Sequence, residues 1–178
     1  MEGKKVRIRA LEKKDLDEAM KWVNDYKVTR TLTSFLYPLS REQEEKILEK
    51  LIEPNERNRA FAIETKKGEY LGNIGFHNID WKNRNAEVGI VIGKKRYWNK
   101  GYGTDAMMTI LDFAFNRMNL HKVYLRVFDF NQGGIKSYMK CGFKKEGHLK
   151  EMFYNEGKYY DMVMMGILKR EFGKNKKG

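Results

Sequence analysis

Hydrophobic and polar residues alternate in several short runs of this chain, and elsewhere apolar residues recur at helical spacing. Alternation is typical of a half-buried strand, whereas apolar residues three or four positions apart indicate an amphipathic helix. The alternating and apolar runs predict strands at residues 6–11, 59–65, 70–80, 86–92, 123–128, 143–154 and 159–168. Helical spacing predicts helices at residues 15–24, 103–118 and 135–140, and one that begins at Ser40.

Turn and capping residues support several of these boundaries. Ser40 and Gln43 fit the capping-box pattern of a helix start, and Pro54 is expected to end that helix. The polar stretches 66–69 and 155–158 predict hairpin turns. Residues 31–39 are expected to be irregular.

The order of these elements is β-αα-βββ-α-β-α-ββ, which predicts a mixed α/β fold. Hairpins dominate, so we expect a central, mostly antiparallel sheet of six to seven strands flanked by about four helices. Strands 86–92 and 123–128 are the exception. Helix 103–118 joins them as a crossover, so they should be parallel neighbours.

Length and composition favour one soluble domain. The chain has 178 residues, which suits a single domain over residues 1–170 followed by a basic tail, 171–178. The single cysteine excludes a disulfide framework within the chain, and no apolar run is long enough for a membrane helix. The N-terminus lacks the apolar region of a secretory signal. These features predict a cytoplasmic protein without a membrane partner.

The charge balance favours anionic partners. The chain carries 36 Lys+Arg and 24 Asp+Glu, a net charge of +12. Such an excess suits nucleic acid, a membrane surface or a phosphate-rich cofactor, although it can also serve solubility alone. Nucleic acid is not the expected partner, because no RNP, KH or helix-turn-helix pattern is present. A basic nucleic-acid-binding module is kept as an alternative.

The strongest chemical signal lies in residues 90–106, where a strand runs into a basic loop and then a glycine-rich helix start. The first N–H groups of a helix are unpaired and partly positive, and glycines let a phosphate approach them. The loop adds four cationic residues, Lys94, Lys95, Arg96 and Lys100. We expect a phosphate or pyrophosphate site at residues 99–104. A helix cap beside a solvated basic loop is the alternative.

Two well-known phosphate motifs do not explain this segment. The P-loop pattern requires a glycine where Trp98 stands. The dinucleotide pattern is formally matched at residues 101–106, but eight residues separate Ile92 from Gly101, so the first glycine is not in a tight turn after the strand. Only 49 residues follow Asp129, too few for the rest of a doubly wound sheet.

Two motifs instead resemble the GNAT superfamily of acetyl-CoA-dependent N-acetyltransferases. Its pyrophosphate loop, Q/R-x-x-G-x-G/A, is matched by residues 98–103, with Trp98 at the position of the usual Gln or Arg. A second signature, N-x-x-A/S-x-x-x-Y-x-x-x-G-F, is matched by residues 131–143, with Gly134 in place of Ala or Ser. The resemblance covers almost the whole chain and favours the ribosomal-protein and spermidine N-acetyltransferase branch.

The resemblance implies the GNAT acyl-CoA acyltransferase fold and direct transfer of an acetyl group from acetyl-CoA to a primary amine. The parallel strands should then splay at their C-terminal ends, where the cofactor's pantetheine arm pairs with the backbone of strand 86–92. An acyl-CoA sensor without turnover is kept as an alternative. The residues that the resemblance places at the cofactor are Ile90, Val91, Ile92, Trp98, Asn99, Lys100, Gly101, Tyr102, Gly103, Thr104, Asn131, Ser137 and Tyr138.

Two residues are candidates for proton transfer. Tyr138 stands where the family has its general acid, and a phenol with a pKa of about 10 suits a thiol leaving group. Glu87 lies 14 residues before Gly101, the spacing of the base glutamate in histone-type members. It could accept the amine proton through water, or it could be only a charged residue at a strand start. Asn131 is also expected to cap the helix that carries Tyr138.

The sequence leaves open whether the acceptor amine belongs to a polyamine, a protein N-terminus or another small amine. It also leaves open whether the protein forms a homodimer. A polycation needs acidic receptors, and the helix that begins at Ser40 carries several. These are Glu42, Glu44, Glu45, Glu49 and Glu53. They alternate with Lys46 and Lys50, so we expect a solvated helix face rather than a receptor.

Metal chemistry is not expected. The three histidines, His77, His121 and His148, lack metal-ligand spacing and have no Cys or carboxylate cluster beside them. Cys141 precedes a glycine at a helix end, and we expect it to be a core residue rather than a nucleophile.

Overall fold

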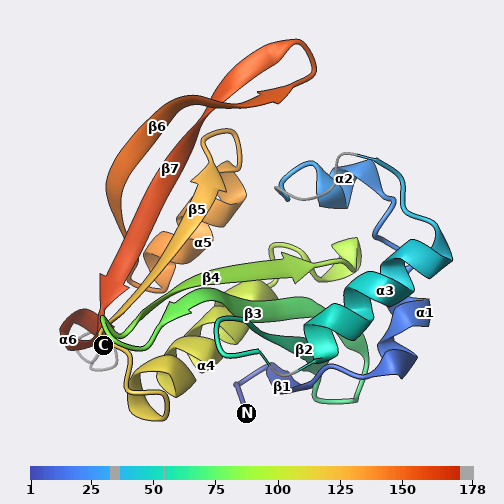
Figure 1. The fold of residues 1–178 in the computed structure, drawn as a ribbon, viewed down its shortest axis with the longest axis horizontal. Coiled ribbons are helices and arrows are strands. Elements are labelled where there is room, and N and C mark those ends of the chain that lie inside the picture. Colours follow the sequence, from blue (N-terminus) through green and yellow to red (C-terminus); the bar gives the residue numbers. More distant parts are fainter. Residues whose placement is uncertain (33–36, 54, 173–178) are drawn as a thin grey trace.

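The computed structural model describes residues 1–32, 37–53 and 55–172 and shows one sheet of seven strands (Figure 1). The strands are β1 (Val6–Ala10), β2 (Arg59–Thr65), β3 (Tyr70–Asp80), β4 (Asn85–Ile92), β5 (Lys122–Phe128), β6 (Lys144–Asn155) and β7 (Lys158–Leu168). The helices are α1 (Leu16–Ala19), α2 (Tyr26–Thr29), α3 (Arg41–Ile52), α4 (Tyr102–Asn116), α5 (Gln132–Lys140) and α6 (Lys169–Phe172). The strand order is β1-β2-β3-β4-β5-β7-β6, and all neighbours are antiparallel except β4 and β5.

This architecture confirms the predicted fold class. The described residues form six helices rather than about four, because the four-residue α2 and α6 are too short to show a periodic pattern. The helix expected at residues 15–24 ends at Ala19. Beyond it the N–H groups of Lys21 and Trp22 donate to carbonyls three residues back, which tightens the chain into turns while keeping a helix-like apolar spacing.

Two expectations fall partly outside the described residues. Pro54 lies there, and the helix before it ends at Ile52 with Glu53 as its C-cap. The irregular segment 31–39 is described only at residues 31–32 and 37–39, which have no helix or strand. The capping box at Ser40 and Gln43 is confirmed, since each side chain accepts from the backbone N–H of the other.

Helices cover both faces of the sheet. Successive residues of a strand point to opposite faces, so Ala62 and Ile63 on β2 belong to different apolar clusters, as do Tyr70 and Leu71 on β3. Helix α4 packs on the face of Ile63 and Leu71, whereas α1 and α3 pack on the other. Figure 1 shows α3 and α4 on either side of β2 and β3. The first part of β3 is therefore buried on both sides, whereas most residues of the edge strand β6 are exposed.

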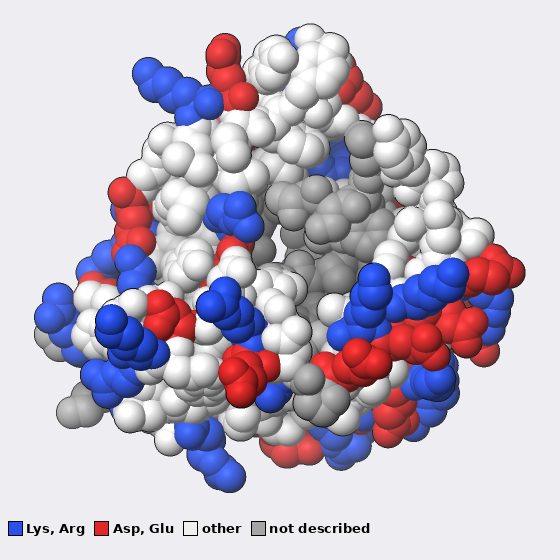
Figure 2. Space-filling model, viewed as in Figure 1, with Lys and Arg blue, Asp and Glu red and all other residues white. Residues whose placement is uncertain are grey.

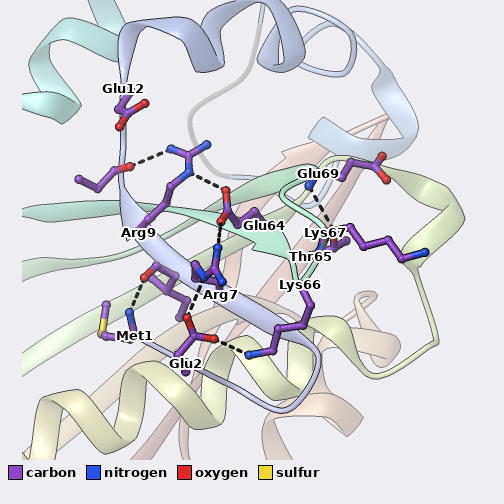
Figure 3. A network of polar contacts seen from close by, with 12 residues as sticks. Met1, Glu2, Arg7, Arg9, Glu12, Glu64, Thr65, Lys66, Lys67 and Glu69 are labelled. Carbon is purple, nitrogen blue, oxygen red and sulfur yellow. Dashed lines mark hydrogen bonds and ion pairs between the residues drawn. The ribbon is translucent and has the colours of Figure 1, made fainter.

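An ion-pair network holds the polar groups beside β1. Glu64 on β2 lies between Arg7 and Arg9 (Figure 3), at 3.3 Å and 2.7 Å from them. Arg9 also binds the buried carboxylate of Asp15 at 2.6 Å. Both buried acids are thus paired, as a carboxylate removed from water requires.

The N-terminal segment is fixed to the start of α4. The carboxylate of Asp105 accepts the backbone N–H groups of Lys4, Lys5 and Val6 at 2.6–3.0 Å. This contact joins positions about one hundred residues apart and brings Lys5 beside the glycine-rich loop.

Strands β4 and β5 are parallel neighbours, as the sequence predicted, but for a short distance only. They pair at Asn85–Lys122, Ala86–Val123 and Glu87–Tyr124. After the third pair β5 continues against β7, and the described residues contain no further β4–β5 pair. The two strands visibly diverge in Figure 1.

Helix α6 spans the expected domain boundary at residue 170. Glu171 binds Lys144 at 2.6 Å, and Phe172 is buried with its ring 5.3 Å from that of Phe115. The boundary therefore falls inside α6. Residues 173–178 of the expected tail lie outside the described part of the chain.

Replacing Phe172 by alanine should lower the free energy of unfolding by about 3–5 kcal/mol, because the substitution leaves a cavity against Phe115. Urea denaturation measures this loss. Arg170→Ala, an exposed change in the same helix, should cost less than about 0.5 kcal/mol. Equal effects of the two substitutions would show that Phe172 does not belong to the core.

Candidate active site

A cleft of about 670 Å³ lies where β4 and β5 separate. It extends from the N-terminal end of α5 across both strands to the inner face of α3. Five of the site residues predicted from the sequence line it together: Glu87, Ile90 and Val91 on β4, Asn131 at the start of α5, and Tyr138 on α5. The strand separation therefore brings the acid and base candidates to one site.

The edge of β4 that faces this cleft carries free backbone groups. Gly93 donates its N–H to the Leu71 carbonyl on β3 at 2.8 Å. Because backbone groups alternate between the two edges of an antiparallel strand, those of Val91 point to β3 and those of Ile90 point to the open edge. Of the three residues predicted to pair with a cofactor arm, Ile90 is thus the best placed. The Ile92 carbonyl accepts the indole N–H of Trp98 at 2.6 Å.

The glycine-rich loop forms the start of α4. Gly101 is its N-cap with φ 82°, a conformation that favours glycine. A Cβ on Gly103 would stand 3.7 Å from Ile92, an ordinary contact, so this position has open space on its other sides. The hydroxyls of Thr104 and Ser137 lie 2.9 Å apart and join the first turn of α4 to α5.

Tyr138 is held in the wall of the cleft. Its ring packs edge-on against Phe143 with centroids 6.0 Å apart. Its hydroxyl has no hydrogen-bond partner among the described residues. Burial, with a smaller effect of Cys141, raises the pKa of Tyr138 to about 12. The phenol therefore keeps its proton at physiological pH and can donate it to a group bound in the cleft.

Glu87 does not act alone. Its carboxylate forms two hydrogen bonds with Arg126 on β5, at 2.7 Å and 3.1 Å, and one with the Asn78 amide at 3.3 Å. This ion pair spans the gap just beyond the last β4–β5 pair. His77 faces Glu87 across the β3–β4 ladder, and burial lowers the pKa of its imidazole. Sequence reasoning did not single out Arg126 or Asn78, because no motif marks them.

Residues 5–144 match the family model of the acetyltransferase (GNAT) domain. The chain belongs to the GNAT acetyltransferase family. The spermidine N(1)-acetyltransferase of Vibrio cholerae serotype O1 is 31% identical over 168 residues, 93% of this chain and 94% of that protein. The uncharacterized N-acetyltransferase p20 of Bacillus licheniformis is 29% identical over 167 residues, 93% of each chain.

A solved structure agrees with this assignment. The crystal structure of spermidine N-acetyltransferase from Vibrio cholerae in complex with CoA and spermine has a TM-score of 0.85 and 30% sequence identity. The match covers 94% of this chain and 97% of that one. This GNAT protein is thus an acyltransferase that catalyses acetyl-CoA-dependent N-acetylation of amines, as the sequence resemblance implied.

The residues of this GNAT enzyme fit acetyl-CoA as the cosubstrate. The open edge of β4 can pair with an amide-rich arm, and the first turn of α4 presents unpaired N–H groups beside the space at Gly103. Lys5 adds a cation at this turn: its ammonium binds the Lys100 carbonyl at 2.7 Å and lies 5.6 Å from the Tyr102 ring centroid. No sequence motif marks Lys5, which is distant along the chain.

The cationic loop differs from the expectation. Lys94 binds Glu18 and Glu69, Arg96 binds Glu69, and Lys95 binds Asp25. These three cations are therefore already neutralised by acids of other elements. Lys100 has no ion-pair partner in the described part of the chain, and with Lys5 it remains available to an anion.

Glu44 also corrects the sequence analysis. It was expected on a solvated helix face, yet it is buried and lines the cleft from α3. It stands four residues before the core residue Leu48, so the two share one face of the helix. The four-residue spacing to Leu48 is the sequence signal for this burial, and the charged residues on either side of Glu44 mask it.

Other expectations concern groups away from the cleft. Cys141 is buried with a free thiol, as expected for a core residue. Within residues 1–32, 37–53 and 55–172, no group of three or more His, Cys, Asp or Glu side chains could hold a metal ion. None of the described helices is both long and apolar enough to cross a membrane.

The Glu69 carboxylate should make the free energy of unfolding of the protein depend on pH. Hydrogen bonds from Lys94, Tyr97 and Arg96 lower the pKa of Glu69 to about 2, from an ordinary value of 4.5. A carboxylate with a depressed folded-state pKa stabilises the fold above its unfolded pKa and loses that effect as the pH falls. Replacing Glu69 by glutamine should therefore destabilise the protein at pH 7, and the difference from the parent should shrink between about pH 4.5 and pH 2.

Urea denaturation at several pH values provides this measurement. Glu45→Gln, which removes an exposed carboxylate from α3, serves as the control and should change little. A Glu69→Gln effect that stays constant down to pH 2 would contradict the assignment.

Proposed function

We propose that acetyl-CoA lies along the open edge of β4 and that the acetyl group passes directly to a primary amine of a polyamine. One observation carries the proposal. Where β4 and β5 part, a single cleft contains the free backbone edge at Ile90, the protonated phenol of Tyr138 and the carboxylate of Glu87.

Cofactor binding is assigned to three groups. The N–H groups of residues 102–104 at the start of α4, with the cations of Lys5 and Lys100, would hold the pyrophosphate. The Ile90 backbone would pair with the pantetheine arm in the manner of an added strand. Trp98 and Ser137 support these groups indirectly, through Ile92 and Thr104. Acetyl-CoA itself supplies an acetyl group activated as a thioester.

Tyr138 would donate its proton to the departing sulfur. Its raised pKa keeps the phenol protonated, so it can serve as the hydrogen-bond donor that a thiolate leaving group requires. Asn131 supports this position because its side chain accepts the Gly134 N–H at 3.0 Å and so caps α5.

Glu87 would receive the proton that the amine must lose before it attacks. An amine with a pKa of about 10 is mostly a cation at neutral pH and is not a nucleophile in that form. Because Arg126 holds both oxygens of Glu87, transfer through an intervening water is favoured over direct contact.

The charges of the cleft support a cationic acceptor. Its lining includes two carboxylates, Glu44 and Glu87, and one guanidinium, Arg126, although the whole chain has a net charge of +12. The spermidine acetyltransferase of Vibrio cholerae described above acts on a polyamine by name, and the crystal structure of spermidine N-acetyltransferase from that organism contains spermine. A polyamine is therefore the acceptor class that site and relatives share.

The nucleic-acid alternative gains no support from the face of the molecule that Figure 2 draws. Figure 2 shows Lys and Arg side chains interspersed with Asp and Glu over the face drawn, rather than a continuous basic stripe. The buried free thiol of Cys141 fits the reducing cytoplasm, where we propose that the enzyme works.

The test of the proposed function is an acceptor screen with acetyl-CoA, followed by mass spectrometry of the products. Spermidine and spermine should be acetylated once or more, with release of free CoA. Acetylation of peptide N-termini but not of polyamines would refute the acceptor assignment. CoA release without any acetylated amine would refute the proposed transfer.

Gly103→Glu should weaken acetyl-CoA binding by more than about 100-fold, because a carboxylate would stand beside the phosphates. Isothermal titration measures the affinity. Gly103→Ala is the matched control and should keep most of it, since a Cβ there makes only an ordinary contact with Ile92. If the glutamate variant binds like the parent, the pyrophosphate lies elsewhere.

Tyr138→Phe should lower kcat by about 10²–10⁴-fold, the range for loss of a general acid. Acetyl-CoA affinity and melting temperature should change little, because the ring and its packing on Phe143 remain. Steady-state kinetics and thermal unfolding provide the measurements. The exposed Tyr154→Phe is the control, and a normal kcat in the Tyr138 variant would remove this residue from the mechanism.

A further inference from the structure

Glu44 occupies an unusual place on α3. The side chains of Glu42, Glu45 and Glu53 are exposed and Glu49 is half-buried, whereas only 5% of Glu44 is exposed. It continues the inner, apolar face of the helix toward its N-terminus and lines the cleft. A carboxylate at such a position is costly unless something pairs with it.

No partner of this carboxylate is found among the described residues. Its Oε2 atom is inaccessible to solvent and makes no hydrogen bond. Burial raises the pKa of Glu44, as expected for a carboxylate without a cation beside it. The dipole of α3 is positive at the N-terminal turn and partly stabilises the negative charge of Glu44. No group of this turn donates a hydrogen bond to Oε2.

The ionisable groups around Glu44 are already engaged, although the buried indole Nε1 of Trp22, which lines the same cleft, has no hydrogen-bond partner among the described residues. The Tyr70 hydroxyl donates to Asn73 at 2.7 Å, although the pKa of Tyr70 responds to the charges of both Asp15 and Glu44. Asp15 is bound by Arg9. Arg126, the guanidinium in the cleft, is bound by Glu87. None of the described residues therefore supplies a cation to Glu44, whereas a cationic ligand bound in the cleft can do so.

The remaining lining near α3 indicates what kind of ligand this is. Trp22, Leu39, Ile47 and Leu51 line the same cleft and present apolar surface. A ligand that suits both features has an ammonium group on an aliphatic chain. A single short amine bound for acetylation near Glu87 and Tyr138 would leave Glu44 without a partner.

We propose that Glu44 binds a second ammonium group of the acceptor and thereby selects polyamines over monoamines. This inference rests on the proposed function and assigns a specificity-determining residue to it. The aliphatic spacer of the polyamine lies along the apolar lining, and the amine at the other end of the chain is the one acetylated. Glu44 takes no part in the chemical step, so its contribution appears in acceptor affinity.

The test compares n-butylamine with spermidine as acceptors for the parent and for Glu44→Gln. Loss of a charge-assisted hydrogen bond should raise the KM for spermidine about 10- to 100-fold. The kcat for spermidine and both constants for n-butylamine should stay within about twofold of the parent, because neither depends on the second ammonium group. Glu45→Gln removes the same charge from the exposed side of α3 and should leave all four constants unchanged.

A second variant separates binding from folding. Glu44→Leu extends the apolar face of α3 and should raise the melting temperature, since an unpaired buried carboxylate is lost. It should nevertheless show the same selective rise in KM for spermidine. If Glu44 had only a structural role, replacing it would change the KM for spermidine and the KM for n-butylamine by the same factor.

The outcomes distinguish this inference from the proposed function. If the parent acetylates no polyamine, the proposed acceptor class and the inference about Glu44 are both wrong. If the parent acetylates spermidine and Glu44→Gln does so with an unchanged KM, the inference about Glu44 is wrong and the proposed function stands. Equal losses for n-butylamine and spermidine also overturn the inference.

Discussion

Strands β4 and β5 pair in parallel for three residue pairs and then diverge, and the whole site is built on that divergence. A strand that loses its neighbour exposes a row of N–H and C=O groups, which must find other partners. At Ile92 the indole of Trp98 supplies one, whereas the backbone of Ile90 still faces the cleft. The ion pair of Glu87 and Arg126 bridges the same gap. The pair closes the narrow end of the gap while the rest stays open to a substrate.

The polar parts of the site are held by contacts between distant segments. Asp105 fixes the N-terminal segment to α4 and so brings Lys5 to the glycine-rich loop. The hydroxyl contact of Thr104 and Ser137 sets α4 against α5, the helix that carries Tyr138. Because these groups are positioned before any substrate arrives, little ordering is left to occur on binding, which is the condition for efficient orientation of reactants.

Charge is distributed in opposite senses inside and outside the cleft. The chain is strongly basic, yet three of the four cations of the basic loop before α4 are paired with acids of other elements. Within the cleft the carboxylates outnumber the guanidinium. Glu44 is the sharpest case, since an apolar residue there would pack better. A buried residue that lowers the stability of the fold, as Glu44 does, is consistent with a role in binding.

The sequence by itself determined the elements and the family. Alternation and helical spacing predicted all seven strands and the long helices, and the motifs at Gly101 and Tyr138 indicated a GNAT enzyme. Local patterns carry this information because strands, helices, caps and turns depend on neighbouring residues. Only the tertiary structure decided which charges meet: it paired Lys94 with Glu69, brought Arg126 to Glu87 and turned Glu44 inward. Such contacts join residues far apart in the chain, and their energies depend on burial, which no local pattern specifies.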